Sequence, residues 1–400
     1  MLRGIELFAG AGGLGMGLSL AGIQSLGVIE WNKDACDTIR GNQRRGFPLV
    51  REWPLFEGDA RKFKYSTLPS GIDLVSGGPP CQPFSICGKH RAYRDERDMF
   101  PVAVEAVRTL QPRAFIMENV RGLTRAAFAN YFDYILRQFE FPEVARKNDE
   151  KWQDHLSRLE RRKTSTRRNC LSYNVIPTIV NAANYGVPQK RYRVFIVGFR
   201  DDLDVRWSFP QPTHSAEALL IDQYVTGEYW ERHGRRRPLA PSKLRQEIAY
   251  YRTRNDRPNL HTRPWMTVRD ALDGLPDPRE PGAEGVPNHR YQAGARSYVG
   301  HTGSPLDLPA KALKAGDHGV PGGENMMVDD DGSVRYFTVR ESARLQTFPD
   351  GYVLHGTWSE AMRQLGNAVP VRLGQIVAAS VANKLLEYDV LRLAQSKGRA

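Results

Sequence analysis

The chain has 400 residues, 40% of them hydrophobic, which is enough for one large domain and a smaller one. No run of about eighteen apolar residues could span a bilayer and the first residues resemble a buried strand rather than a signal peptide, so we expect a soluble intracellular protein. Lys and Arg outnumber Asp and Glu by 57 to 45, and the net charge of +12 suits a polyanionic partner, although an arginine-rich soluble enzyme would look the same.

In chain order, the first half alternates strand-like apolar runs with helical patterns. This alternation predicts a doubly wound α/β fold with a mostly parallel sheet and helices on both faces. The predicted strands are Ile5–Phe8, Leu26–Glu30, Ile72–Ser76, Ala114–Met117, Tyr173–Ile179 and Arg193–Phe199. Helices are predicted at Leu14–Ala21 and Val102–Leu110, which end where Gly22 and Pro112 interrupt the pattern.

The second half differs in composition. From Asp201 onward prolines and glycines cluster and charges scatter, which predicts a loop-rich second domain. Regular patterns return near Phe337, and apolar residues at helical spacing predict a last helix at Val371–Leu386. We therefore expect a large domain at residues 1–200 and 336–400, with a smaller domain inserted at residues 201–335. A basic segment, Arg158–Arg168, is expected to be a solvated helix.

A glycine-rich loop at residues 8–15 joins the first predicted strand to the first predicted helix. Gly10, Gly12 and Gly13 allow a ligand to approach the backbone and the helix N-terminus. Glu30 ends the next strand, where its carboxylate could accept hydrogen bonds from ribose hydroxyls. These features predict an adenosine site, and they leave a nicotinamide nucleotide open as the alternative to other adenosine cofactors.

Two residues near this loop could contact the adenine ring. Trp31 follows Glu30 and could stack on the ring, or it could be an ordinary core aromatic residue. Asp59 follows an apolar pair and could reach the adenine amino group.

Residues 77–85, Gly-Gly-Pro-Pro-Cys-Gln-Pro-Phe-Ser, predict a rigid turn at the carboxyl edge of the sheet, where α/β enzymes place their chemistry. Cys81 in this turn is the candidate thiolate nucleophile. The alternative, a small buried apolar residue, fits a Pro-Pro-Cys turn poorly. The four cysteines, at positions 36, 81, 87 and 170, show no spacing typical of disulfides or zinc, so no metal site is indicated.

Further charged residues are expected near Cys81. Glu118 follows the strand Ala114–Met117 and should reach the same edge if that strand neighbours the one before Cys81. Arg191 and Arg193 precede or begin a strand at alternate positions, which predicts that they share one face. Such arginines suit a carbonyl oxygen or a phosphate, whereas the alternative is a surface run of charges.

A thiolate, an acid and a methyl donor together favour methylation of a pyrimidine carbon. Carbon 5 of cytosine is a weak nucleophile, and addition of Cys81 to carbon 6, with Glu118 holding a proton on ring nitrogen 3, would activate it. Loss of the proton at carbon 5 would then release the cysteine. In duplex DNA the ring is stacked, so the base must be flipped into a pocket.

The ordered motifs resemble the DNA cytosine-5 methyltransferase family across the chain except its variable middle. The residues that carry the resemblance are Glu6–Gly13, Glu30–Trp31, Gly58–Asp59, Gly78–Ser85, Glu118–Val120, Gln189–Arg193, Arg340–Glu341, Leu345–Pro349 and Gln364–Pro370. The resemblance implies that an S-adenosylmethionine pocket is lined by Phe8, Glu30, Trp31, Asp59, Pro80 and Asn367. It also implies that Arg193, with Arg191 nearby, contacts the carbonyl of the flipped cytosine, and that no metal is needed.

The resemblance further implies that residues 201–335 form a target-recognition domain that binds double-stranded DNA. Candidate polar residues in its loops are His289, Arg290, Arg296, Lys311, Lys314 and His318, most of which we expect to contact phosphate rather than bases. The absence of appended regulatory domains favours a monomeric bacterial restriction-modification enzyme, acting in the cytoplasm beside a separate cognate endonuclease.

Three alternatives remain at this point. An oxidoreductase would use the glycine loop but not the Pro-Pro-Cys turn. A DNA-binding module without activity would not need Cys81, Glu118 and Asn367 together. Methylation of RNA on the same scaffold is the nearest alternative, and the long insertion favours duplex DNA over it.

Overall fold

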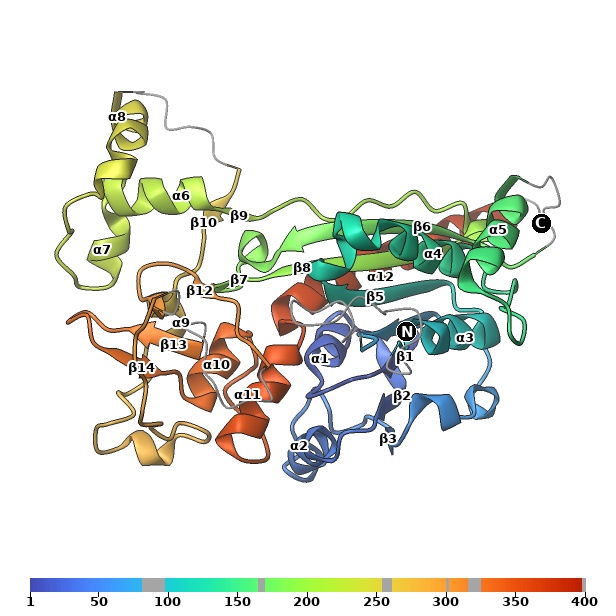
Figure 1. The fold of residues 1–400 in the computed structure, drawn as a ribbon, viewed down its shortest axis with the longest axis horizontal. Helices are drawn as coiled ribbons and strands as arrows, with labels where there is room; N and C mark the ends of the chain where they lie inside the picture. The colour runs from blue at the N-terminus through green and yellow to red at the C-terminus, as the bar shows by residue number, and fades with distance from the viewer. Residues whose placement is uncertain (81–97, 165–169, 254–260, 300–301, 316–324, 398–400) are drawn as a thin grey trace. The chain divides into compact units, whose positions relative to one another are not determined.

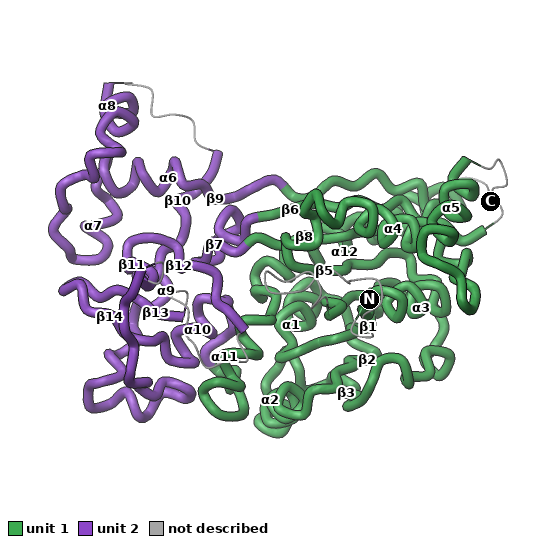
Figure 2. Tube along the Cα trace, in the orientation of Figure 1, with its two compact units in different colours: residues 1–180, 192–210, 351–400 green, residues 181–191, 211–350 purple. Residues whose placement is uncertain are grey.

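The computed structural model describes residues 1–80, 98–164, 170–253, 261–299, 302–315 and 325–397. It divides into two compact units, which Figure 2 shows in two colours. The first unit contains Met1–Val180, Tyr192–Pro210 and Gly351–Ala400, and the second contains Asn181–Arg191 and Gln211–Asp350. Within the described residues, no helix is both long and apolar enough to cross a membrane.

These boundaries differ from the expected ones at residues 200 and 335, for a physical reason. The short strand β7 (Gln189–Lys190) pairs with β12 (Ala310–Lys311), which draws residues 181–191 into the second unit. The segment after residue 335 remains in the second unit because Arg335 forms a buried ion pair with Glu341.

The first unit is built on a seven-stranded sheet (Figure 1) whose strand order is β3-β2-β1-β4-β5-β8-β6. The strands are β1 (Arg3–Leu7), β2 (Gln24–Glu30), β3 (Leu55–Glu57), β4 (Leu74–Gly77), β5 (Ala114–Val120), β6 (Tyr173–Asn181) and β8 (Tyr192–Arg200). Strands β1 to β5 pair in parallel, and β8 runs antiparallel to β5. All six predicted strands and the mostly parallel α/β fold are confirmed.

Helices of the first unit flank this sheet. They are α1 (Gly13–Leu20), α2 (Lys33–Arg44), α3 (Phe100–Leu110), α4 (Ala129–Glu140), α5 (Trp152–Thr164), α11 (Trp358–Asn367) and α12 (Val371–Lys397). Every residue from Ala114 to Asn119 of β5 is buried, so both faces of the sheet are covered there. The predicted end of the last helix at Leu386 is wrong: α12 continues past the apolar pattern, and Val390 and Leu393 in its last turns are exposed.

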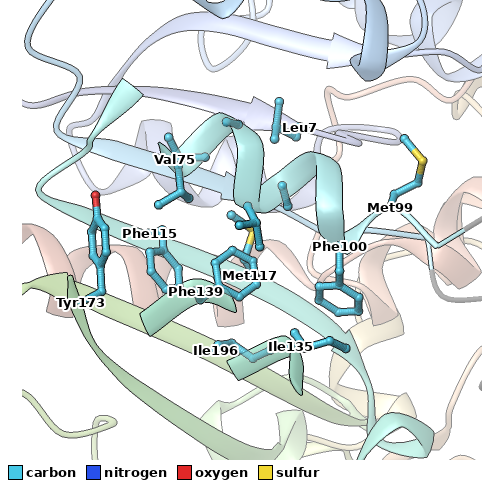
Figure 3. Close-up of a cluster of buried hydrophobic side chains, with 14 of the residues drawn as sticks. Leu7, Val75, Met99, Phe100, Phe115, Met117, Ile135, Phe139, Tyr173 and Ile196 are labelled. Carbon is cyan, nitrogen blue, oxygen red and sulfur yellow. The ribbon is translucent and has the colours of Figure 1, made fainter. Parts of the chain in front are cut away.

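The core under β4 and β5 is rich in aromatic and aliphatic residues (Figure 3). Phe115 of β5 stacks on Phe139 of α4 with their ring centroids 4.8 Å apart, and Phe100 of α3 meets the same ring edge-on. Each buried aromatic side chain removes a large apolar surface from water. This packing fixes the two strands whose carboxyl ends carry the Gly-Gly-Pro-Pro turn and Glu118.

The second unit has short elements joined by long loops, as its composition predicted. Its helices are α6 (Ala216–Leu220), α7 (Glu228–Arg232), α8 (Arg245–Thr253), α9 (Val268–Leu272) and α10 (Val339–Leu345). Besides β7 and β12 its strands are β9 (His214–Ser215), β10 (Arg263–Pro264), β11 (Ser304–Pro305), β13 (Met326–Val328) and β14 (Val334–Tyr336). Because regular backbone hydrogen bonding is sparse, side-chain hydrogen bonds and ion pairs hold many of these short elements together.

Candidate active site

The catalytic edge is formed by the ends of β4 and β5. Gly77 is in register with Met117 on the neighbouring parallel strand, so Gly78 and Glu118 both lie one residue beyond. A side-chain carbon added to Gly78 would lie 3.4 Å from Oε2 of Glu118. The start of the turn, at Gly78, therefore lies next to Glu118, and Cys81 itself lies outside the described residues.

Glu118 is paired with Arg193. The antiparallel register places Arg193 of β8 opposite Val120, on the same face as Glu118. Nε of Arg193 lies 2.6 Å from Oε1 of Glu118, and only 11% and 8% of the two side chains are exposed. Burial lowers the pKa of Arg193, and the charge of Glu118 opposes that shift. The structure thus brings a carboxylate and a guanidinium together at the edge where Cys81 follows.

Asn119 holds the turn that precedes Cys81. Its Nδ2 donates to the carbonyl of Pro79 at 2.9 Å, and its Oδ1 accepts from the backbone N–H of Val120 at 2.8 Å. The side chain is 5% exposed, so these bonds form away from water. Sequence reasoning gave Asn119 no role, although alternation along β5 sends it to the face opposite Glu118.

Arg191 precedes β8, as predicted, and Arg193 lies within that strand, so the predicted placement of the two arginines on one face stays a prediction. The ladder is interrupted at Arg191, whose carbonyl accepts from the N–H of Ala182. Its guanidinium is buried within the second unit and donates to the carbonyl of Leu313 at 3.1 Å. These contacts favour a structural role for Arg191.

The glycine-rich loop has the tight backbone expected of it. Phe8, Gly10 and Gly12 have positive φ angles of 57°, 56° and 82°, and α1 begins at Gly13. A left-handed backbone costs free energy for a residue as large as phenylalanine, and such strain often marks a binding site. A side chain at Gly10 would meet no atom within 4 Å, whereas one at Gly12 would lie 2.8 Å from the Trp53 ring. Gly10 therefore leaves space beside the loop, and Gly12 is required by packing.

Glu30 ties this loop to the end of β2. One carboxylate oxygen accepts from the N–H of Gly10 at 2.7 Å, and the other accepts from the N–H groups of Trp31 and Asn32. Burial raises the pKa of Glu30, and these backbone hydrogen bonds oppose that shift. Trp31 is 72% exposed, so it is not the core aromatic of the alternative interpretation.

Asp59 lies in a loop fixed to the same region, because the N–H of the preceding Gly58 donates to the carbonyl of Glu30. Its carboxylate accepts two hydrogen bonds from Nε and one from Nη2 of Arg61, at 2.7 to 3.0 Å. The hydrogen bonds and charge of Arg61 lower the pKa of Asp59. Asp59 is thus held as an ionised acceptor.

The returning C-terminal segment supports the cofactor side of the first unit. The hydroxyl of Tyr352 donates to the carbonyl of Ala11 in the glycine-rich loop at 2.9 Å, and Thr38 of α2 donates to Gln364 of α11. Sequence reasoning missed Tyr352, because a contact across 341 positions leaves no local pattern. Asn367 is the last residue of α11 and is exposed, so its contact with a cofactor stays a prediction.

Known proteins agree with this arrangement. A family model described as C-5 cytosine-specific DNA methylase matches residues 2–142 and 160–383. The chain belongs to that family. It is therefore a DNA (cytosine-5)-methyltransferase, and its family uses S-adenosylmethionine as methyl donor.

Similar proteins match this methyltransferase over most of its length. The type II methyltransferase M.AplI of Arthrospira platensis is 30% identical, with 94% of this chain and 84% of the relative covered. M.NgoMIV of Neisseria gonorrhoeae is 28% identical, with 95% and 97% covered. A DNA modification methyltransferase from an E. coli prophage shares the fold with a TM-score of 0.57 at 20% identity, over 96% of this chain and 99% of that one.

One of the two described cysteines makes a poor nucleophile. Burial raises the pKa of Cys36 to about 12, so this side chain stays a thiol at neutral pH. Cys170 lies beside Arg162 and belongs to none of the motifs that carry the family resemblance. The candidate Cys81, by contrast, follows a turn whose Pro79 is held by Asn119.

The candidate base-reading residues of the methyltransferase fall into two groups. His289 is buried and bonded to Thr338 and to the carbonyl of Pro276, so its expected access to DNA is wrong. Arg290, Arg296 and Lys314 are exposed and Lys311 is partly exposed, while His318 lies outside the described residues.

Proposed function

We propose that this methyltransferase moves a methyl group from S-adenosylmethionine to carbon 5 of a flipped-out cytosine, within one specific sequence of double-stranded DNA, using Cys81 as its covalent nucleophile. The buried pair of Glu118 and Arg193 carries the proposal, since it lies beside the turn from which Cys81 continues. The bond from Asn119 to Pro79 supports it, because it fixes the start of that turn.

The residues of the first unit fit an S-adenosylmethionine site. The proposed cofactor residues are Phe8, Gly10, Gly12, Gly13, Glu30, Trp31, Asp59, Pro80 and Asn367, all within this unit. Open space at Gly10 leaves room for the ligand, the exposed Trp31 offers a stacking surface, and Asp59 offers an ionised acceptor for an amino group. When bound, S-adenosylmethionine supplies an electrophilic methyl group, and no metal is needed.

The protein's own groups would act as follows. The thiolate of Cys81 forms a bond to carbon 6 while Glu118 holds a proton on ring nitrogen 3, so that electron density moves to carbon 5. Arg193 donates to the ring carbonyl and, by pairing with Glu118, keeps both groups aimed at the base. After carbon 5 has accepted the methyl group, its proton leaves to water and the bond from sulfur to carbon 6 breaks. The proton on ring nitrogen 3 returns to Glu118, which regenerates both Cys81 and the acid.

We assign the enzyme to a type II restriction-modification system. Its relatives M.AplI and M.NgoMIV are named type II methyltransferases, and both are bacterial. We also propose that the enzyme is a monomer that modifies DNA in the bacterial cytoplasm, and that a separate endonuclease cuts the same sequence when it is unmethylated.

Bisulfite sequencing tests the proposed function directly. DNA from a methylation-free host that expresses the enzyme should contain unconverted cytosines in one recurring sequence context. The host expressing Cys81→Ser should show none. Full conversion with the folded wild-type enzyme would overturn the proposal, and modification of RNA in place of DNA would reassign the substrate.

A further inference from the structure

Lys190 of the second unit lies over a tryptophan and close to two other lysines, Lys243 and Lys311. Strand β7 pairs with β12 in parallel, with Lys190 in register with Lys311, so both side chains leave the same face of this small sheet. The ammonium of Lys190 lies over the ring of Trp265, 5.2 Å from its centroid. Trp265 follows β10, and Figure 2 shows these elements within one unit.

Trp265 is held in place as a platform for Lys190. Its indole Nε1 donates to Oδ1 of Asn184 at 3.0 Å, and its backbone N–H donates to the carbonyl of Ser215 at 3.1 Å. A cation over a fixed indole face is attracted by the negative charge of the ring face. The arrangement therefore keeps one lysine in a defined position at the surface.

The lysines repel one another. Burial against Trp265 and its surroundings lowers the pKa of Lys190, and the positive charge of Lys243 lowers it further. Lys311 donates to the hydroxyl of Thr302 at 3.2 Å, which leaves its charge uncompensated. Among the residues that the structure describes, none of the three lysines forms an ion pair with a carboxylate. Charges gathered in this way favour an anion from outside the protein.

Three arginines of the same unit show the opposite pattern. Arg232 pairs with Asp222, Arg269 pairs with Asp307 and Asp330, and Arg335 pairs with Glu341. These guanidinium groups hold the loops of the unit together, so their charges are already compensated. Lys190, Lys243 and Lys311 differ from these arginines, because no carboxylate of the described residues pairs with them.

We propose that Lys190, Lys243 and Lys311 form a site for a backbone phosphate of the DNA substrate. The proposal rests on the proposed function, since it assumes that the second unit binds DNA. A phosphate would neutralise the repulsion between the ammonium groups and release condensed counterions from the DNA. Such a contact positions the duplex and carries no sequence information.

The salt dependence of DNA binding tests the site. Kd for a labelled duplex containing the methylated sequence is measured by fluorescence anisotropy between 50 and 200 mM KCl, for wild type, Lys190→Gln, Lys243→Gln, Lys311→Gln and the triple variant. Each lost phosphate contact should reduce the slope of log Kd against log salt by about 0.9, so the wild-type affinity should fall about 3.5-fold more over this range than that of a variant lacking one contact.

Two exposed lysines of the first unit provide matched controls. Lys163 and Lys384 are paired with Glu140 and Glu387, and Lys163→Gln and Lys384→Gln should leave the slope unchanged. An unchanged slope in all three single variants, with wild type methylating DNA, overturns the phosphate site and leaves the proposed function intact. A wild-type enzyme that methylates no DNA overturns the proposed function instead. Equal slope changes in the control variants also overturn the site, because they indicate a diffuse effect of charge.

Discussion

Charged residues have different roles in the two units. At the edge of the large sheet, Glu118 and Arg193 end regular strands whose register brings them together. In the second unit, Arg191 and Arg335 are buried against a backbone carbonyl and a carboxylate that hold short elements in place. A charged residue on a regular strand can thus be positioned to act on a substrate. In a loop-rich unit, a residue of the same type often supplies hydrogen bonds that hold short elements together.

The largest effect at the edge of the large sheet is expected from replacing Cys81. A duplex with 5-fluorocytosine at the target can accept the methyl group but cannot lose fluorine as a cation, so enzyme and DNA should stay covalently joined in boiling detergent. Cys81→Ser should form no such complex and should abolish methyl transfer, while Cys87→Ser should retain both. Absence of the complex, on a sequence that the wild-type enzyme methylates, would contradict the covalent mechanism.

Glu118→Gln should have the next largest effect. The amide keeps the shape of the side chain but cannot supply the acid for ring nitrogen 3, so turnover should fall about a hundredfold or more. Binding of DNA, followed by anisotropy, should change far less. Because the variant also leaves Arg193 buried without its carboxylate, the thermal midpoint is measured alongside. Near-normal turnover in a folded variant would remove Glu118 from the mechanism.

Replacing Arg193 or Arg191 should distinguish a role in catalysis from a role in stability. Arg193→Gln should lower turnover by about a hundredfold, as loss of a donor to a reacting oxygen does. Arg191→Gln should instead leave the carbonyl of Leu313 without its donor and lower the free energy of unfolding by about 1–3 kcal/mol, with turnover of the folded fraction retained. The structural role of Arg191 would be contradicted if Arg191→Gln lowered turnover as strongly as Arg193→Gln and left the free energy of unfolding unchanged.

The features that could be predicted from the sequence are those that depend on local patterns. Strand periodicity located the strands of the first unit, and the order of parallel strands placed Glu118 beside the Gly-Gly-Pro-Pro turn. The glycine-rich loop and Glu30 were predicted to lie together and are joined by the hydrogen bond at Gly10. Each of these features depends on short segments and on a sheet edge that collects strand ends.

The features that could not be predicted from the sequence depend on contacts between residues far apart in the chain. The bond from Tyr352 to Ala11 and the burial of His289 against Thr338 join segments whose sequences carry no sign of the partner. Arg191 was singled out by its position beside Arg193, and its contact with the carbonyl of Leu313, 122 positions away, leaves no local pattern. In a loop-rich unit such contacts decide which charges remain at the surface.

Glu6 is a buried acid in the strand that leads to the glycine-rich loop, and it offers a test that leaves the reacting groups untouched. Its side chain is 3% exposed, and its carboxylate lies against Gly15, where an added side-chain carbon would be 2.1 Å away. Burial raises the pKa of Glu6 to about 8, the charge of Glu30 raises it as well, and a hydrogen bond from the backbone of Gly15 opposes the shift. Glu6 is therefore protonated in the folded protein at neutral pH.

The sign of the pH dependence follows from this protonation. Between the ordinary pKa of 4.5 and about 8, the folded state keeps the proton of Glu6 and the unfolded state loses it. The free energy of unfolding should therefore decrease as the pH rises through this window, by at most about 1.4 kcal/mol per pH unit. Glu6→Gln cannot ionise and should flatten that decrease, whereas Glu52→Gln, at a side chain that is 82% exposed, should not. The stability of all three proteins is measured as the urea unfolding midpoint, at half-unit steps from pH 5 to 8.5. Parallel curves for wild type and Glu6→Gln would mean that Glu6 is ionised in the folded state, and that the strand beneath the glycine-rich loop holds a charge in its core.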